Sequence, residues 1–185
     1  VLIVSQYYPP EITAAAYRIG DTHRLLREWG HDVKVITATP HRSPMLEEDS
    51  DEITDMDVIR LQQPALTRSH SLAYIMNYSS FALRAFLAAM RLSKSFDYEV
   101  VLGSSPPLFI VLCTIPLRLL KRRPVVLDVR DIWPGSVAGI GKMSKGSLLE
   151  LGGKLLEKLA YRYSDRMVCV SGPMRDYLVE ESGKS

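Results

Sequence analysis

The chain has 185 residues, of which 46% are hydrophobic and 24% are charged, and its formal net charge is +2. This length fits one domain with a sizeable core, and this composition is typical of a globular protein rather than of a disordered or fibrous chain. Because the net charge is small, electrostatics give no argument for nucleic-acid binding, and no nucleic-acid partner is expected.

Cysteine usage and hydropathy predict a cytoplasmic protein. Cys113 and Cys169 each lie in an apolar run without a neighbouring His or Cys, which is typical of reduced core residues. The apolar residues 1–5 are too few for a secretory signal. The best candidate for a membrane-spanning segment, residues 71–92, carries Asn77 and Arg84 near its middle, and lipid would not easily tolerate these groups.

Short runs rich in Val, Ile and Leu alternate with helical segments along the chain. Such alternation predicts an α/β fold with a doubly wound, mostly parallel, Rossmann-like sheet that has helices on both faces. We expect one domain over residues 1–185 with strand order 3-2-1-4-5-6. The strands are predicted at residues 1–4, 32–37, 57–61, 99–103, 125–129 and 166–170.

Helices are expected between these strands. Gly30 is predicted to end the first helix as a left-handed cap, and further helices are predicted at 72–95 and 107–121. The acidic segment 41–56 is expected to be an exposed loop rather than a metal site. The residues predicted to face the core on the first helix are Ala15, Ile19, Thr22, Leu26 and Trp29.

Two helices are predicted in the last third of the chain. Ser147 and Glu150 have the spacing of a capping box, and Gly172-Pro173 is a typical helix start. The buried face of the first of these helices is predicted to comprise Leu148, Leu151, Leu155, Leu159 and Tyr163.

Ligands of doubly wound sheets bind outside the carboxyl ends of the strands, near the point where the strand order reverses. This rule selects four loops in the sequence. They are "SQYYPPEIT" after the first strand, "GSSPP" after the fourth, "DVRDIWPGS" after the fifth and "SGP" after the sixth.

The loop after the fifth strand contains Asp128, Arg130, Asp131 and Trp133 within six residues. Asp131 could accept a proton or bind a hydroxyl, Arg130 could face an anion, and Trp133 offers a flat face for a sugar ring. A structural alternative is that Asp128 and Arg130 form a surface pair, that Asp131 caps a turn and that Trp133 lies in the core.

Hydroxyl groups follow the fourth and sixth strands. Ser104 and Ser105 precede a helix, and helix N-termini attract anions. Ser171 stands at the start of the last helix in the same way. Each serine could instead cap its helix, and for Ser171 we favour capping.

The opening loop lacks G-x-G-x-x-G, so a tight dinucleotide-binding turn is not supported. The small residues Thr13 and Ala14 would let a ligand approach the first helix. Glu11 could hold an acceptor hydroxyl, and Arg18 could reach a phosphate, with a solvated helix face as the alternative for Arg18. His23 is expected to be structural or exposed.

The stretch "VLIVSQYYPPEITAAAYRIGDTHRLLREWGHDVKVITATP" resembles the start of retaining glycosyltransferases of family 4, which have the GT-B fold. "SSPPLF" and "DVRDIWPGS" resemble the subgroup that builds bacterial surface polysaccharides, which includes fucosaminyltransferase-like enzymes. The resemblance covers essentially all 185 residues.

This resemblance implies a hexosyltransferase with two Rossmann-like domains that face each other across a cleft. The N-terminal domain holds the acceptor, a sugar or a lipid-linked sugar, and the C-terminal domain binds a nucleotide-diphosphate sugar and carries an E-x7-E motif. The chain matches the N-terminal domain, so we expect the donor domain to be absent from it. We also expect the chain alone to be inactive and to bind no cofactor or metal.

Many members of the family have a histidine after the fourth or fifth strand, near the transferred sugar. This chain has Ser104-Ser105-Pro106 and the segment 128–131 at those places. The resemblance therefore makes Asp131 and Arg130 the expected catalytic residues, and it makes any histidine-based role doubtful here.

Three other readings stay open. Apolar residues and cations in 72–95, with "LKRR" at 120–123, suggest peripheral contact with the inner face of the cell membrane, unless the helix packs on the sheet and its cations are solvated. The chain could also be a self-contained flavodoxin-like nucleotide-binding enzyme, which the missing glycine fingerprint and P-loop oppose, or a non-catalytic interaction domain.

Overall fold

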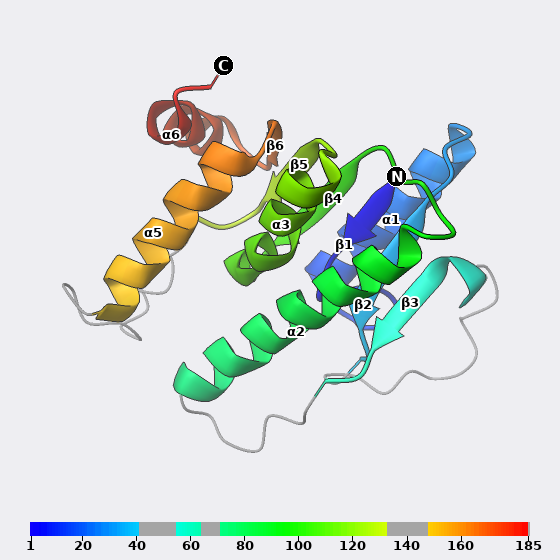
Figure 1. Ribbon diagram of the computed structural model, residues 1–185. Coiled ribbons are helices and arrows are strands. Elements are labelled where there is room, and N and C mark those ends of the chain that lie inside the picture. Colours follow the sequence, from blue (N-terminus) through cyan, green and yellow to red (C-terminus); the bar gives the residue numbers. More distant parts are fainter. Residues whose placement is uncertain (41–54, 64–70, 133–147, 185) are drawn as a thin grey trace.

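The computed structural model describes residues 1–40, 55–63, 71–132 and 148–184 (Figure 1). Its centre is a six-stranded sheet in which every pair of neighbouring strands is parallel, with order β3-β2-β1-β4-β5-β6. The predicted fold class and strand order are therefore confirmed. The strands are β1 (Leu2–Val4), β2 (Lys34–Ala38), β3 (Val58–Leu61), β4 (Val101–Ser105), β5 (Val125–Val129) and β6 (Arg166–Cys169).

Helices cover both faces of the sheet. Figure 1 shows α2, α3 and α5 in front of the strands and α1 behind them. α6 packs against α5. The helices are α1 (Ala14–Glu28), α2 (Ser71–Leu92), α3 (Val111–Lys121), α5 (Leu148–Tyr163) and α6 (Gly172–Ser182), with 3-10 turns η2 (Asp55–Asp57) and η3 (Leu108–Ile110).

The period-two alternation of side chains divides the apolar residues between two cores. On β1, Leu2 and Val4 pack with α2 and α3, whereas Ile3 lies on the opposite face with Ile19 of α1. All three β1 side chains are fully buried. This burial on both faces explains why β1 is a continuous apolar run rather than an alternating one.

The ends of α1 follow from local sequence. The Thr13 side chain accepts a hydrogen bond from the Ala16 N–H at 3.1 Å and caps the helix. Gly30 follows with φ +84°, which confirms the predicted left-handed position. The expectation that Trp29 packs on the core is wrong, because Trp29 is the C-cap residue and its side chain is 70% exposed.

The predicted buried face of α5 is also wrong at two positions. Leu151 and Leu155 are 58% and 60% exposed, whereas Ala160 and Tyr161 pack into the core. Glu157 is buried as well, where its carboxylate accepts hydrogen bonds from the hydroxyls of Tyr161 at 2.8 Å and Tyr177 at 3.3 Å. Burial raises the pKa of Glu157. Ser147 and the side chain of Leu148 lie outside the described residues.

Cys113 lies in the core and Cys169 is half-buried, and both are free. Burial raises the pKa of the Cys113 thiol. Within the described residues, no group of His, Cys, Asp and Glu could hold a metal ion, and no helix has the length and apolarity needed to cross a membrane. Most of the predicted acidic loop, residues 41–54, lies outside the described part of the chain.

Candidate functional site

Three strand ends define the candidate site. Because all strands are parallel, their carboxyl ends share one edge of the sheet, toward which the arrows of β1 and β3 point in Figure 1. The strand order reverses between β1 and β4, and β5 follows directly. The loops after β1, β4 and β5 therefore meet at the switch point where doubly wound folds bind ligands.

An ion pair joins the two sides of this edge. Nη2 of Arg18, one turn into α1, donates to Oδ1 of Asp128 at 2.8 Å, and Nε donates to Oδ2 at 3.3 Å. The Asp128 side chain is 5% exposed and that of Arg18 is 38% exposed. Two of the structural alternatives are thus wrong: Arg18 does not lie on a merely solvated face, and Asp128 pairs with Arg18 rather than with Arg130.

Ser104 and Ser105 lie at the end of β4 and do not cap the helix that follows. Parallel pairing sets Ser104 opposite Asp128, and the Ser104 hydroxyl donates to Asp128 Oδ2 at 3.3 Å. The Ser105 hydroxyl is buried and makes no hydrogen bond to the rest of the described chain. The N-cap of η3 is Pro107, which makes no side-chain capping bond, so the helix-capping alternative for both serines is wrong.

Sequence reasoning missed a buried amide pair at the same edge. Gln6, two residues after the end of β1, donates from Nε2 to Oδ1 of Asn77 on α2 at 3.1 Å. Both side chains are buried, at 1% and 7% exposure. The signal that could have found them is a single Asn in a largely apolar helix together with a Gln just after the switch-point strand.

The tyrosines and prolines of the opening loop form a packed wedge instead of a glycine turn. The Tyr8 ring is buried in the α1-side core, and its hydroxyl shares a 2.5 Å hydrogen bond with Nδ1 of the buried His23. Burial raises the pKa of Tyr8 to about 12. Arg60 of β3 donates to the Pro9 carbonyl at 2.9 Å.

The wedge also depends on Gly20 of α1. A Cβ atom at Gly20 would lie 2.7 Å from Pro9 Cγ, so this close approach of loop and helix requires a glycine. Three predicted site residues of the same loop differ in burial and role. Glu11 is buried, Thr13 is used as the N-cap, and Ala14 is exposed at the first turn of α1.

The remaining predicted site residues make fewer contacts with the groups at this edge. Arg130 is half-buried just after β5, with its Nε buried and without a hydrogen-bond partner in the described residues, and Asp131 is exposed beside it. Trp133 lies outside the described residues. The Ser171 hydroxyl caps α6 by accepting from the Met174 N–H at 3.4 Å, as the capping interpretation predicts.

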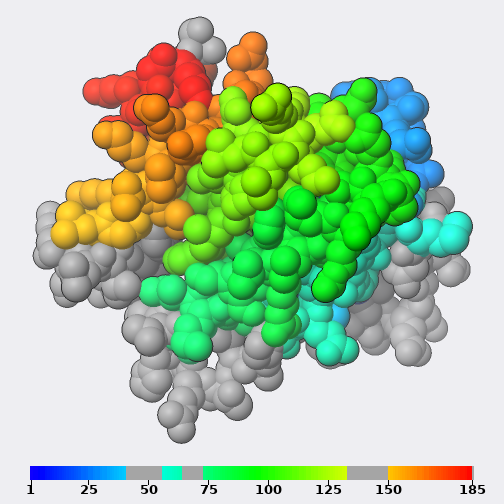
Figure 2. Space-filling view, in the orientation of Figure 1, coloured from blue at the N-terminus to red at the C-terminus, as the bar shows by residue number. Residues whose placement is uncertain are grey.

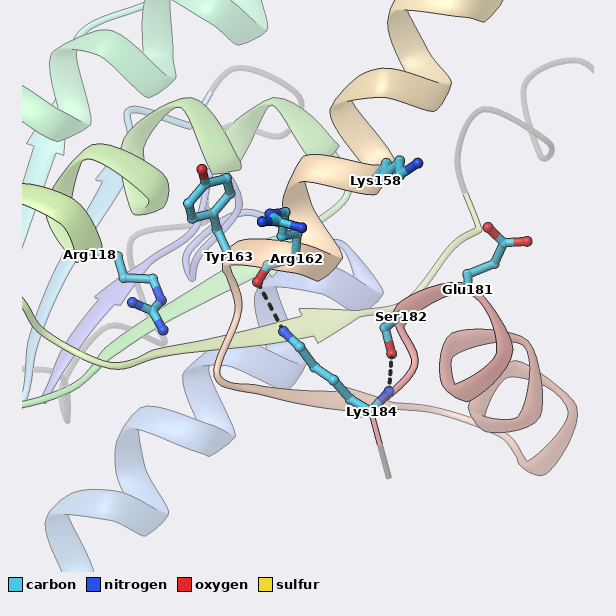
Figure 3. A pocket seen from close by; sticks show the side chains of 7 residues that line it. All are labelled: Arg118, Lys158, Arg162, Tyr163, Glu181, Ser182 and Lys184. Atoms are coloured by element: carbon cyan, nitrogen blue, oxygen red, sulfur yellow. Dashed lines mark hydrogen bonds between the residues drawn. The ribbon is translucent and has the colours of Figure 1, made fainter.

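A cavity of about 500 Å³ lies away from this edge, among the C-terminal ends of α3, α5 and α6 (Figure 3). Lys184 Nζ donates there to the carbonyls of Tyr161 at 2.6 Å, Arg162 at 3.1 Å and Ser164, and so caps the end of α5. Arg118 pairs with Asp165 at 2.5 Å. Because these two cations already bind groups of the protein, we assign the cavity to packing of the helix ends.

The model of the family described as glycosyl transferase 4-like domain matches residues 13–184. The chain belongs to this glycosyl transferase 4-like family. The match covers nearly every described element from the N-cap of α1 to α6, and it supports the resemblance noted from the opening loop. No significant match is found among curated proteins.

For a glycosyltransferase 4-like domain, the carboxyl edge of β1, β4 and β5 offers a coherent set of groups. Arg18 supplies a fixed positive charge oriented by a buried carboxylate, and Ser104, Ser105 and Gln6 supply hydroxyl and amide groups beside it. Groups held this rigidly can bind polar ligands without reorganising at the moment of reaction.

Proposed function

We propose that the domain forms the acceptor-side wall of a retaining, nucleotide-sugar-dependent glycosyltransferase that acts in surface-polysaccharide synthesis. A second domain would bind the nucleotide-diphosphate sugar and face the carboxyl edge of β1, β4 and β5. The observation that carries the proposal is the Arg18–Asp128–Ser104 network at the strand-order switch point, in a chain that belongs to this glycosyltransferase family.

The chemistry of the reaction suits this set of groups. In the donor, the bond between the anomeric carbon of the sugar and the diphosphate oxygen breaks, and negative charge builds up on the leaving diphosphate. Fixed cations and dipoles stabilise that charge. We propose that Arg130 faces the developing charge and that Asp131, exposed beside it, binds the acceptor hydroxyl. Arg18 and the serines would position these residues and the acceptor.

Paired substitutions in the enzyme that carries this domain test the proposal. We expect Asp131→Asn and Arg130→Ala to lower kcat/KM for sugar transfer at least about tenfold, because each removes a group that touches substrate. The matched controls are Asp97→Asn and Arg123→Ala, an exposed ion pair at the opposite edge of the sheet. Unchanged transfer in the Asp131 and Arg130 variants would contradict the assigned roles.

The isolated domain gives a second test. The 185-residue chain is expected to show no transfer and to bind nucleotide sugars weakly, because the donor side of the cleft lies in the other domain. Tight nucleotide binding by this chain alone, measured by calorimetry, would instead favour a self-contained nucleotide-binding enzyme. Inversion of the anomeric configuration in the product, read by NMR, would contradict the retaining mechanism.

A further inference from the structure

Three helices on one face of the sheet present apolar side chains to solvent. Eight of the sixteen exposed large hydrophobic side chains in the described residues lie on α2, α3 and α5. α3 packs against α2 on one side and α5 on the other, so their outer surfaces form one continuous face, which Figure 2 views directly. We call it the helical face; its apolar residues are Met76, Leu83, Leu87, Leu112, Leu119, Leu120, Leu151 and Leu155.

The exposure is a property of whole helices and not of frayed ends. On α2, Met76, Leu83 and Leu87 are spaced by seven and four residues, which keeps them on one side of the helix. The opposite side of α2 packs on the sheet through Phe81 and Ala85, both at most 1% exposed. The helix therefore has an inner apolar stripe that folding requires and an outer one that folding does not.

Positive charge borders the outer stripes. α2 and α3 contain no Asp or Glu at all. Each helix of the face ends at the amino edge of the sheet, where cations collect. Two carboxylates near this border already have cationic partners, since Asp97 pairs with Arg123 and Asp165 with Arg118, and Glu181 lines the cavity together with Lys158. The bordering cations are Arg91, Lys94, Lys121, Arg122, Lys158 and Arg162, the last two lining the cavity in Figure 3.

We propose that the helical face docks on the surface of an anionic lipid bilayer. The exposed leucines enter the boundary between headgroups and acyl chains, and the bordering cations contact lipid phosphates. Charge selects this partner over a second copy of the chain, because a second copy would bring its own cations and no acidic residue on α2 or α3 to meet them.

The face also leads to the candidate site. Met76 is the neighbour of Asn77, whose side chain binds Gln6 at the carboxyl edge. A bilayer under the helical face would therefore lie beside the strand ends where ligands are expected. The docking itself does not depend on sugar transfer, so its test needs no donor or acceptor.

Co-sedimentation of the chain with vesicles tests the docking. We expect binding to vesicles of phosphatidylcholine mixed with phosphatidylglycerol, weaker binding at high salt, and little binding to phosphatidylcholine alone. The double variant Leu119→Ser/Leu120→Ser should lower the partition coefficient at least about tenfold. Arg91→Gln and Lys121→Gln should each lower it about fivefold.

Variants on α1 are the matched controls. Trp29→Ser removes an apolar side chain that is at least as exposed, and Arg24→Gln removes an exposed cation, both from the other face of the sheet. Neither variant should change vesicle binding. Circular dichroism melts identify any variant that fails to fold. Absence of binding to the anionic vesicles, or equal losses in the controls, would overturn the proposal. A dimer that Leu119→Ser/Leu120→Ser converts to monomers, without vesicle binding, would overturn it in favour of a copy-to-copy interface.

Discussion

α1 and the α2–α3 pair cover opposite faces of one sheet and both expose some large apolar side chains, but their outer surfaces differ in charge. On α1, Arg24 lies between Asp21 and Glu28 at 3.2 and 2.8 Å, and it forms a chain of exposed ion pairs. On α2 and α3, leucines and cations are exposed and carboxylates are missing. Core packing restricts the side chains on the inner stripe of a covering helix. The side chains on its outer stripe therefore reflect the environment of that surface.

The buried sides of these helices also differ, in how many polar groups they contain. The α1 side buries polar groups, including His23 and the Asp128 carboxylate that receives Arg18. The core under α2 and α3 is mainly aliphatic and aromatic, and its buried polar residues include Asn77 of α2 and Thr114 of α3. Polar groups are buried where the fold assembles its site, and apolar groups are exposed where we propose that it meets lipid. Four substitution experiments can break or sharpen this contrast.

The largest effect is expected from two leucines of α3. Leu117 is fully buried and Leu120 is 64% exposed. Leu117→Ala should lower the free energy of unfolding by about 2 to 5 kcal/mol, because it leaves a cavity in the core. Leu120→Ala should change it by no more than about 0.5 kcal/mol. Chemical denaturation measures both, and equal losses would show that the outer stripe also serves folding.

Removing the cation of the buried pair should have the next largest effect. Arg18→Ala leaves the Asp128 carboxylate buried, with the Ser104 hydroxyl as its remaining side-chain donor among the described residues. We expect a loss of about 2 kcal/mol, less than for fully buried pairs because Arg18 is partly exposed. The control Arg24→Ala breaks exposed, solvent-screened pairs and should have a much smaller effect on stability. A loss for Arg24→Ala as large as that for Arg18→Ala would contradict the contrast.

Two helix-interior glycines, one on each face, should respond with opposite signs. Gly20→Ala forces a Cβ against the Pro9 ring and should destabilise the fold by about 1 kcal/mol after the gain in helix propensity. Gly152→Ala meets nothing within 4 Å on α5 and should stabilise the fold by about 0.5 to 1 kcal/mol. Thermal melts would read both signs, and a stabilising Gly20→Ala would mean that the opening loop yields to the added methyl group.

The smallest effect is a pH dependence from His23. Burial, and secondarily the charge of Arg27, lowers the pKa of His23 below its ordinary 6.5. Its Nε2 is buried without a hydrogen-bond partner in the described residues, so the folded state disfavours the imidazolium. The unfolded chain therefore takes up the proton first, and stability that is present above pH 6.5 is lost as the pH falls.

The difference between two variants isolates this effect. His23→Gln should remove part of the loss of stability below pH 6.5, whereas His31→Gln, at an exposed position after the same helix, should keep it. Denaturation at a series of pH values gives the slopes. Identical slopes for wild type and His23→Gln would show that His23 does not titrate differently in the folded state.

Much of the fold could be predicted from the residues alone. Apolar runs between helical segments indicate parallel strands, and the right-handed crossover rule leaves few orders for six of them. Thr13 and Gly30 mark the ends of α1 through local hydrogen bonding and backbone conformation. Each of these features depends on interactions within a few residues, or on a general property of L-amino acid chains, so the sequence pattern carries it.

Packing alone decided the rest. Arg18 and Asp128 are 110 residues apart, and Gln6 and Asn77 are 71 apart, so no spacing in the sequence reveals that they touch. On α5, periodicity identifies an apolar stripe at Leu151 and Leu155 but not the neighbour that it faces. The side of α5 that packs into the core instead carries Ala160 and Tyr161, and α5 contacts α3, α6 and η3. Contacts between distant side chains depend on how the helices pack on the sheet and on one another. This packing determines which face of each helix is buried.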